Sequence, residues 1–116
     1  MKDSANFRSE ALRIGGERVR SERALDVLDP YSGERVGTVA MASLEQVRRA
    51  MEIAKAYKPT LSRYERAAIL QRAAALLRER TEEASDLITR ESGLSKKDSM
   101  YEVGRVCEML GTFTFT

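Results

Sequence analysis

Histidine and tryptophan are absent from this sequence, cysteine occurs once and proline only twice. Histidine is the commonest general base and the commonest metal ligand in proteins, so its absence argues against catalytic and metal centres of the usual kinds. We therefore expect no catalytic residue and no metal ligand in these 116 residues. The single cysteine, Cys107, excludes a disulfide bond within the chain, which is compatible with a reducing cytoplasm.

Long apolar runs are lacking as well. No run approaches the roughly 18 residues of a membrane-spanning helix, and the polar start over residues 1–10 lacks the apolar centre of a signal peptide. Neither sign of charge is in excess, because 20 basic residues are matched by 18 acidic ones. The two signs are interspersed, which does not favour a nucleic-acid surface built from arginines. We expect a cytoplasmic protein with no membrane or nucleic-acid partner.

The composition that is present, 42% hydrophobic and 33% charged, is typical of a soluble globular domain. Residues 1–12 are expected to form a flexible N-terminus. Alternating apolar residues predict short strands over 14–19, with a turn at Gly15-Gly16, over 24–28 and over 36–40. Gly33 supplies the turn residue before the last of these strands, because glycine adopts positive φ without strain.

Three or four helices are predicted after the strands. Two capping boxes, in which a serine precedes Gln or Glu by three residues, mark the first two helix starts at Ser43 and Ser62. A break is expected between residues 78 and 83 with Thr81 as a new N-cap, and Gly93 is predicted as a C-cap. The expected buried stripes are Leu44, Val47, Met51 and Ala54; Leu70, Ala73, Ala74 and Leu77; and Met100, Val103, Cys107 and Leu110.

Few residues are candidates for chemistry. Cys107 lies among apolar neighbours and is interpreted as a small buried hydrophobe. Gly15-Gly16 has no third glycine or Lys-Ser/Thr pair behind it, so it does not predict a phosphate loop, and we expect no cofactor-binding residue. Lys96-Lys97 suits an ordinary helix surface. Arg105 either covers its helix with its alkyl stem or binds an anion, and Gly104 beside it suggests close packing.

Four segments resemble the aldehyde dehydrogenase family in order and spacing. They are Ile14-Gly15-Gly16-Glu17, the turn Asp29-Pro30-Tyr31-Ser32-Gly33-Glu34, the helix from Arg63-Tyr64-Glu65-Arg66 to Leu77, and Glu91-Ser92-Gly93-Leu94-Ser95-Lys96. The resemblance implies an α/β fold in which N-terminal strands precede three to four helices, within an incomplete domain. Residues 13–110 would then be the N-terminal portion of the cofactor-binding domain. Residues 111–116 form an atypical tail that alternates like a strand.

The resemblance also implies a function for the complete enzyme. Members of the family oxidise an aldehyde to the acid with NAD or NADP and form homo-oligomers. Their catalytic cysteine, glutamate and cofactor turn come later than this chain extends, so the isolated chain is expected to bind no cofactor. Residues 56–59, 86–91 and 96–105 are most similar to phosphonoacetaldehyde dehydrogenases, which would act in phosphonate breakdown. Arg105 is then a substrate-binding candidate, because a guanidinium matches a dianionic phosphonate.

Two alternatives remain open at this point. Apolar stripes without the rest of an enzyme would leave a small helical interaction module that self-associates and has no enzymatic activity. Binding to nucleic acid through arginines is the less favoured alternative, because acidic residues lie between them.

Overall fold

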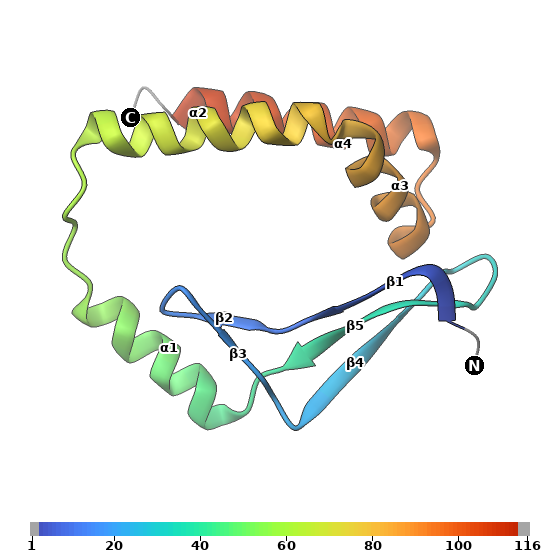
Figure 1. Cartoon of the computed structure of the whole chain (residues 1–116), viewed down its shortest axis with the longest axis horizontal. Coiled ribbons are helices and arrows are strands. Elements are labelled where there is room, and N and C mark those ends of the chain that lie inside the picture. The colour runs from blue at the N-terminus through green and yellow to red at the C-terminus, as the bar shows by residue number, and fades with distance from the viewer. Residues whose placement is uncertain (1–2, 114–116) are drawn as a thin grey trace. The chain divides into compact units, whose positions relative to one another are not determined.

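The computed structural model describes residues 3–113, and the chain divides into two compact units, one ending at Lys58 and one beginning at Pro59. The first unit holds all of the described strands and one helix, and the second holds three helices (Figure 1). This arrangement confirms the predicted order, with strands first and helices after them. Four helices are present among the described residues, at the upper end of the predicted number.

A mixed three-stranded sheet forms most of the first unit. Its strand order is β1 (Asp3–Glu10), β5 (Arg35–Met41) and β4 (Arg23–Leu28), with β1 parallel and β4 antiparallel to β5. The flexible N-terminus predicted for residues 1–12 is therefore wrong over β1. Residues 1 and 2 lie outside the described range. Strand β1 could not be predicted because its run Asp3-Ser-Ala-Asn-Phe-Arg is polar and because its hydrogen-bonding partner, β5, lies over 20 residues later.

The predicted turn at Gly15-Gly16 is confirmed, and it closes a hairpin. Strands β2 (Leu12–Ile14) and β3 (Glu17–Val19) pair antiparallel, and Gly15 and Gly16 connect them with φ values of 60° and 85°. Ile14 is one of the few deeply buried apolar residues of this unit, together with Val36.

The turn between β4 and β5 is tightly hydrogen-bonded. The Asp29 carboxylate accepts from the backbone N–H groups of Tyr31 (2.8 Å) and Ser32 (3.0 Å), and the Gly33 N–H donates to the Asp29 carbonyl (2.8 Å). Gly33 has a φ of 71°, as its place in the turn requires. The aspartate thus fixes the turn from within, as is typical of an Asx turn.

Helix α1 (Leu44–Ala56) follows β5 and begins at the predicted capping box. The Gln46 N–H donates to Ser43 Oγ, and Gln46 Oε1 accepts from the Ser43 N–H. The helix packs against β2, where the Ile53 side chain approaches Gly15. No residue of α1 is buried, however, so the predicted buried stripe of Leu44, Val47, Met51 and Ala54 is exposed within this chain.

The second unit is a three-helix bundle of α2 (Arg63–Glu79), α3 (Thr81–Ser92) and α4 (Lys96–Thr112), in which α2 and α3 both pack on α4 (Figure 1). The capping box at Ser62, the break near residue 80 and the Gly93 C-cap (φ 76°) are confirmed. Thr81 is not the N-cap of α3. Arg80 takes that position without a side-chain hydrogen bond that caps the backbone, and Thr81 Oγ1 instead donates to the Arg78 carbonyl (2.8 Å).

The core of this bundle is small and partly polar. Ala74, Val103 and Cys107 are its buried apolar residues, and Ser85 and Ser99 are fully buried. On α4 the innermost residues are Ser99, Val103 and Cys107 at four-residue spacing, whereas the predicted Met100 is 40% exposed. The strand-like pattern of the tail is not followed at Gly111 and Thr112, because α4 continues to Thr112. Residues 114–116 lie outside the described part of the chain.

The exposed surface is large for a protein of 13.0 kDa. The chain exposes 9117 Å², whereas two separate globular units of half this mass would together expose about 7,600 Å². The excess lies partly in large apolar side chains, which are described below.

Candidate functional site

Arg105, the residue that sequence analysis proposed as a substrate ligand, lies on α4 with an exposed side chain. Its Nη1 donates to both carboxylate oxygens of Glu102, one helical turn earlier, at 3.0 and 3.2 Å. An exposed pair of this kind contributes about 0–1 kcal/mol. Glu102 therefore holds the Arg105 guanidinium only weakly, and a better-placed anion could replace Glu102 as its partner.

Gly104 next to Arg105 has open space beside it. A Cβ atom added there would meet no atom within 4 Å outside the helix itself. Close packing, which sequence analysis suggested as the reason for this glycine, is thus not found among the described residues. The glycine leaves bare backbone beside Arg105.

Cys107 is only 3% exposed and free of any disulfide bond. It lies one turn beyond the buried Val103 on the inner side of α4, which confirms its interpretation as a small buried hydrophobe. A substrate carbonyl could not reach a sulfur at this depth.

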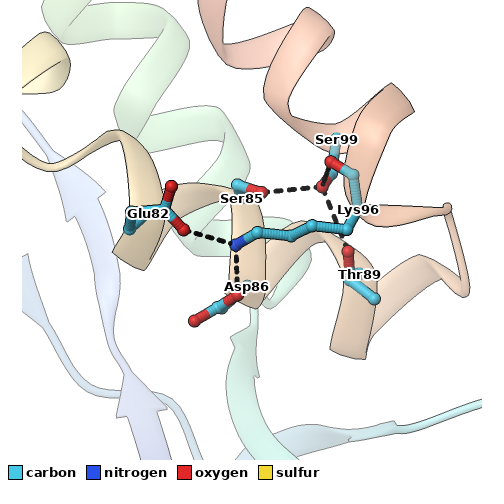
Figure 2. A network of polar contacts seen from close by, with 6 residues as sticks. All are labelled: Glu82, Ser85, Asp86, Thr89, Lys96 and Ser99. Carbon is cyan, nitrogen blue, oxygen red and sulfur yellow. Dashed lines mark hydrogen bonds and ion pairs between the residues drawn. The ribbon is translucent and has the colours of Figure 1, made fainter.

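The most connected polar cluster of the second unit joins α3 to α4, and sequence analysis did not find it. Figure 2 shows Lys96, at the first position of α4, reaching across to Glu82 (2.9 Å) and Asp86 on α3. The hydrogen bonds to Asp86 and then to Glu82 raise the pKa of the Lys96 ammonium above its usual value. Lys96 therefore acts as a fixed positive charge at the end of the helix pair.

Next to Lys96, three hydroxyl groups form a hydrogen-bonded network centred on Ser99 (Figure 2). Ser99 Oγ lies 2.8 Å from Ser85 Oγ, accepts from Thr89 Oγ1 (3.1 Å) and donates to the Lys96 carbonyl (3.0 Å). Because Ser99 has one proton and gives it to the carbonyl, Ser85 has to be the donor in their mutual hydrogen bond. Each buried hydroxyl of the network is therefore satisfied, as buried polar groups need to be.

This serine–lysine cluster does not suit nucleophilic catalysis. A lysine that activates a serine needs a lowered pKa and access to the hydroxyl proton, but the pKa of Lys96 is raised and its ammonium contacts carboxylates. Ser99 is fully buried, so no substrate can approach it. The cluster is a structural connection between α3 and α4. Its only sequence signal was the four-residue spacing of Ser99 from Val103 and of Ser85 from Thr89.

In the first unit, a cleft of about 600 Å³ lies between the sheet and the hairpin. Ser9 and Thr38 lie on its floor with their hydroxyls hydrogen-bonded to each other (3.0 Å), and Arg18 on its wall pairs with Glu10 at 3.4 Å. The Gly15-Gly16 turn, which would be the nearest resemblance to a phosphate loop, is part of the hairpin and lies against Ile53. The described residues thus offer neither a nucleophile with a base nor a cradle for a dinucleotide.

The described range, residues 3–113, holds no group of three or more His, Cys, Asp or Glu side chains that could bind a metal ion. None of its helices is long and apolar enough to cross a bilayer.

Comparison with known proteins gives one consistent result. The family model described as "Aldehyde dehydrogenase family" matches residues 18–115. Among curated proteins, the chain is 32% identical over 111 residues to a 3-sulfolactaldehyde dehydrogenase of Priestia megaterium, covering 95% of the chain and 23% of the relative. It is 36% identical over 97 residues to an NADP(+) succinate-semialdehyde dehydrogenase of Deinococcus radiodurans, covering 81% and 21%.

Solved structures agree in shape. Aldehyde dehydrogenase 21 of Physcomitrella patens superimposes with a TM-score of 0.85 at 28% identity over 90% of this chain and 23% of its own. Lactaldehyde dehydrogenase of Escherichia coli gives a TM-score of 0.82 at 26% identity, over 92% and 24%. The chain therefore spans about a quarter of the length of the proteins that it matches.

Proposed function

Because the chain belongs to the aldehyde dehydrogenase family, we propose that it serves as the N-terminal part of an enzyme that oxidises an aldehyde to the acid with NAD or NADP. The observation that carries this proposal is the family match over residues 18–115. Alone, the chain is catalytically silent, since its one thiol is buried and histidine is absent.

Residues 13–110 act, in this proposal, as the N-terminal portion of the cofactor-binding domain, with 111–116 as a short tail. The described residues do not themselves fit a dinucleotide, so the chain contributes scaffold and later residues supply the cofactor site, the nucleophile and the general base. The complete enzyme would act in the cytoplasm as a homo-oligomer.

The substrate that we propose is an anionic aldehyde, with phosphonoacetaldehyde as the specific candidate. Two supports exist beyond the similarity of residues 56–59, 86–91 and 96–105. Relatives of this chain act on 3-sulfolactaldehyde, succinate semialdehyde and malonate semialdehyde, which all carry an acidic group. In addition, Arg105 is exposed and is held only by the neighbouring Glu102, so it is available as an anion ligand.

The function is tested in a chimera in which this chain replaces the matched segment of the Deinococcus radiodurans relative. We expect the chimera to reduce NADP with an aldehyde substrate, measured as NADPH absorbance, and the isolated chain to give no turnover. An acceptor lacking its matched segment is the negative control. A soluble, folded chimera without activity would contradict the proposal, and so would turnover by the isolated chain.

Arg105 is tested in the same chimera. Because a charge-assisted hydrogen bond contributes about 1.5–3 kcal/mol, Arg105→Gln should raise the KM for phosphonoacetaldehyde by about 10- to 100-fold and leave the KM for a neutral aldehyde unchanged. Arg72→Gln on the exposed side of α2 is the matched control. An unchanged KM for phosphonoacetaldehyde would remove Arg105 from the substrate site.

A second candidate function is a helical interaction module without enzymatic activity. The exposed apolar residues on α1 and α4, such as Met51 (69%) and Met109 (53%), favour it. It differs from the first candidate in one respect, because a module of this kind would need no further part of the family's fold. The activity of the chimera decides between the two.

A further inference from the structure

The short connection between β3 and β4, residues 20–22, is held in place by hydrogen bonds from two neighbouring elements (Figure 1). The Arg20 carbonyl accepts from Gln46 Nε2 on α1 (2.9 Å). Ser21 Oγ donates to the Met41 carbonyl at the end of β5 and accepts from the Arg23 N–H (3.4 Å). The backbone that carries Arg20 and Arg23 is therefore fixed, although both of these residues are exposed.

This connection borders the cleft of about 600 Å³ between the sheet and the hairpin. The floor of the cleft is one face of the sheet, because Ser9 lies opposite Thr38, Ala24 lies opposite Ala40, and residues two apart on a strand share a face. All four of these side chains are small. They leave this part of the sheet face unfilled, which explains why a cleft remains above it.

The charge around the cleft is predominantly positive. Its lining holds three guanidinium groups, those of Arg18, Arg20 and Arg23, and a single carboxylate, that of Glu10. Glu10 lies 3.4 Å from Arg18. Within residues 3–113, neither the Arg20 nor the Arg23 side chain has an acidic partner. A cleft lined by one sign of charge concentrates ions of the opposite sign, so this cleft attracts anions.

The cleft also offers a neutral hydrogen-bond donor. Thr38 Oγ1 donates to Ser9 Oγ (3.0 Å), and the hydroxyl proton of Ser9 itself has no acceptor among the described residues. A guanidinium presents N–H groups in a planar fork that matches two oxygens of a phosphate group. Two unpaired guanidinium groups and one hydroxyl donor at the same cleft suit a tetrahedral oxyanion.

A second cleft, of about 780 Å³, adjoins the first and shares Arg20 and Arg23 with it. It is also lined by Arg49, but Glu22 and Glu45 supply two carboxylates, so three arginines there face two acidic residues. The excess of positive charge is therefore larger in the first cleft, and an anion is expected to bind there.

We propose that the first cleft binds the phosphate group of a small phosphate monoester, with Arg20, Arg23 and the Ser9 hydroxyl as its ligands. The site is independent of the proposed function. Its volume of about 600 Å³ lies within the range of about 300–1,000 Å³ that is usual for small-molecule sites, so it has room for more than a phosphate ion. The remainder of the ester would lie over Ala24 and Ala40.

The proposal is tested by isothermal titration calorimetry of the chain with glycerol phosphate, at an ionic strength held constant with NaCl. We expect saturable binding with a Kd of about 1 mM or tighter. Arg20→Gln/Arg23→Gln should weaken binding at least about tenfold, because it removes charge-assisted hydrogen bonds. Arg48→Gln/Lys55→Gln, which removes the same charge from α1 outside both clefts, should leave the Kd unchanged. Absence of saturable binding by the wild type, or equal binding by the cleft variant, would overturn the proposal.

Ser9→Ala separates a built site from a general attraction to positive charge, because it leaves every charge in place. We expect it to weaken binding about threefold or more, as loss of a hydrogen bond does. An unchanged Kd would contradict the proposed geometry.

Two further ligands identify the anion in the wild-type chain. Inorganic phosphate should bind more weakly than glycerol phosphate, because it makes no contact with the rest of the cleft. Equal affinity for the two would assign the site to free phosphate and overturn the monoester. Acetate that bound as tightly as glycerol phosphate would overturn recognition of a phosphate group altogether.

Discussion

Gly37 is the residue on which the pairing of β1 with β5 depends most directly. It is buried where β1 and β5 run parallel and lies opposite Arg8. A Cβ atom at this position would come within 2.4 Å of the Arg8 carbonyl oxygen, which belongs to the backbone and cannot move away without shifting the strand. Glycine is thus required here by the close approach of two chains rather than by its φ angle.

We predict that Gly37→Ala destabilises the first unit by about 1–3 kcal/mol, as overpacking of a close contact does. Gly104→Ala is the matched control, because its added methyl group meets open space, and it should stabilise α4 by up to about 1 kcal/mol. Urea denaturation followed by circular dichroism measures both. Equal effects of the two substitutions would show that β1 is not held against β5 in solution.

Ser99 is the centre of the hydroxyl network between α3 and α4. We predict that Ser99→Ala costs about 1–3 kcal/mol, because it removes the acceptor of the hydroxyl protons of buried Ser85 and half-buried Thr89. Ser92→Ala, at an exposed position on α3, should stay within about 0.5 kcal/mol of the wild type. The double variant Ser85→Ala/Ser99→Ala should cost less than the sum of its parts in a thermal unfolding cycle. Strict additivity would mean that the two hydroxyls do not interact.

Residue roles were only partly predictable from sequence. Cys107 could be placed because a cysteine among apolar residues at helical spacing is most often buried. Ser99 could not, because serine is usually exposed and its burial depends on Ser85, fourteen residues earlier on another helix. The pairing of Arg105 with Glu102 could have been predicted, because an acidic and a basic residue three apart are neighbours on a helix surface.

Among the elements, the three strands of the sheet are tied together by one arginine. Arg35 on β5 donates from Nε to Asp3 on β1 (2.7 Å) and from Nη1 to Asp26 on β4 (3.3 Å), and its guanidinium lies 5.0 Å from the centre of the Phe7 ring. The hydrogen bond from Arg35 lowers the pKa of the Asp3 carboxyl below its ordinary value. The charged form of Asp3 therefore contributes to holding β1 in the sheet.

The sign of the resulting pH dependence follows from that lowered pKa. A carboxyl group with a lower pKa in the folded state adds stability above its unfolded pKa and loses that stability as the pH falls through the folded pKa. We predict that the wild type is more stable than Asp3→Asn at neutral pH, that this difference shrinks below about pH 4, and that it vanishes once the pH lies below the lowered pKa of Asp3. Thermal melts of both proteins across the acidic range measure it, with Glu22→Gln on the exposed connection before β4 as control. A difference that persists unchanged at the acidic end would contradict the role of the charge.

The starts of α1 and α2 were predicted from the sequence, whereas the pairing of β1 was not. The serines at positions 43, 62 and 95 each accept from a backbone N–H three residues later, so the information that sets these helix starts is local. Strand β1 pairs across more than 20 residues, and no local pattern in its polar sequence specifies that partner. For the same reason, the uncovered side of α1 was misjudged, because periodicity identifies an apolar stripe without indicating what packs on it.

For the whole molecule, exposed apolar surface is the dominant property. Large apolar side chains are exposed on three of the described helices, and examples are Met51 on α1, Ile69 on α2 and Met109 on α4. Each unit is therefore folded but exposes apolar side chains to water, which is energetically unfavourable.

We predict that the isolated chain self-associates in a concentration-dependent manner, because apolar patches without cover bind one another. Sedimentation velocity over a range of concentrations should show a rising average mass, and Val47→Lys/Met51→Lys should reduce that rise more than Glu52→Lys does. A single monomeric species at all concentrations would show that the exposed side chains form no adhesive surface.

The parallel pairing of β1 with β5 has a consequence for synthesis on the ribosome. Because β1 is made first and its neighbour in the sheet ends at Met41, the nascent strand has to wait on the order of seconds for its partner at ordinary rates of translation. During that interval the polar side chains of β1 make non-native pairing with another strand less favourable. The polar sequence that made β1 hard to predict thus also suits a strand that leaves the ribosome before its partner.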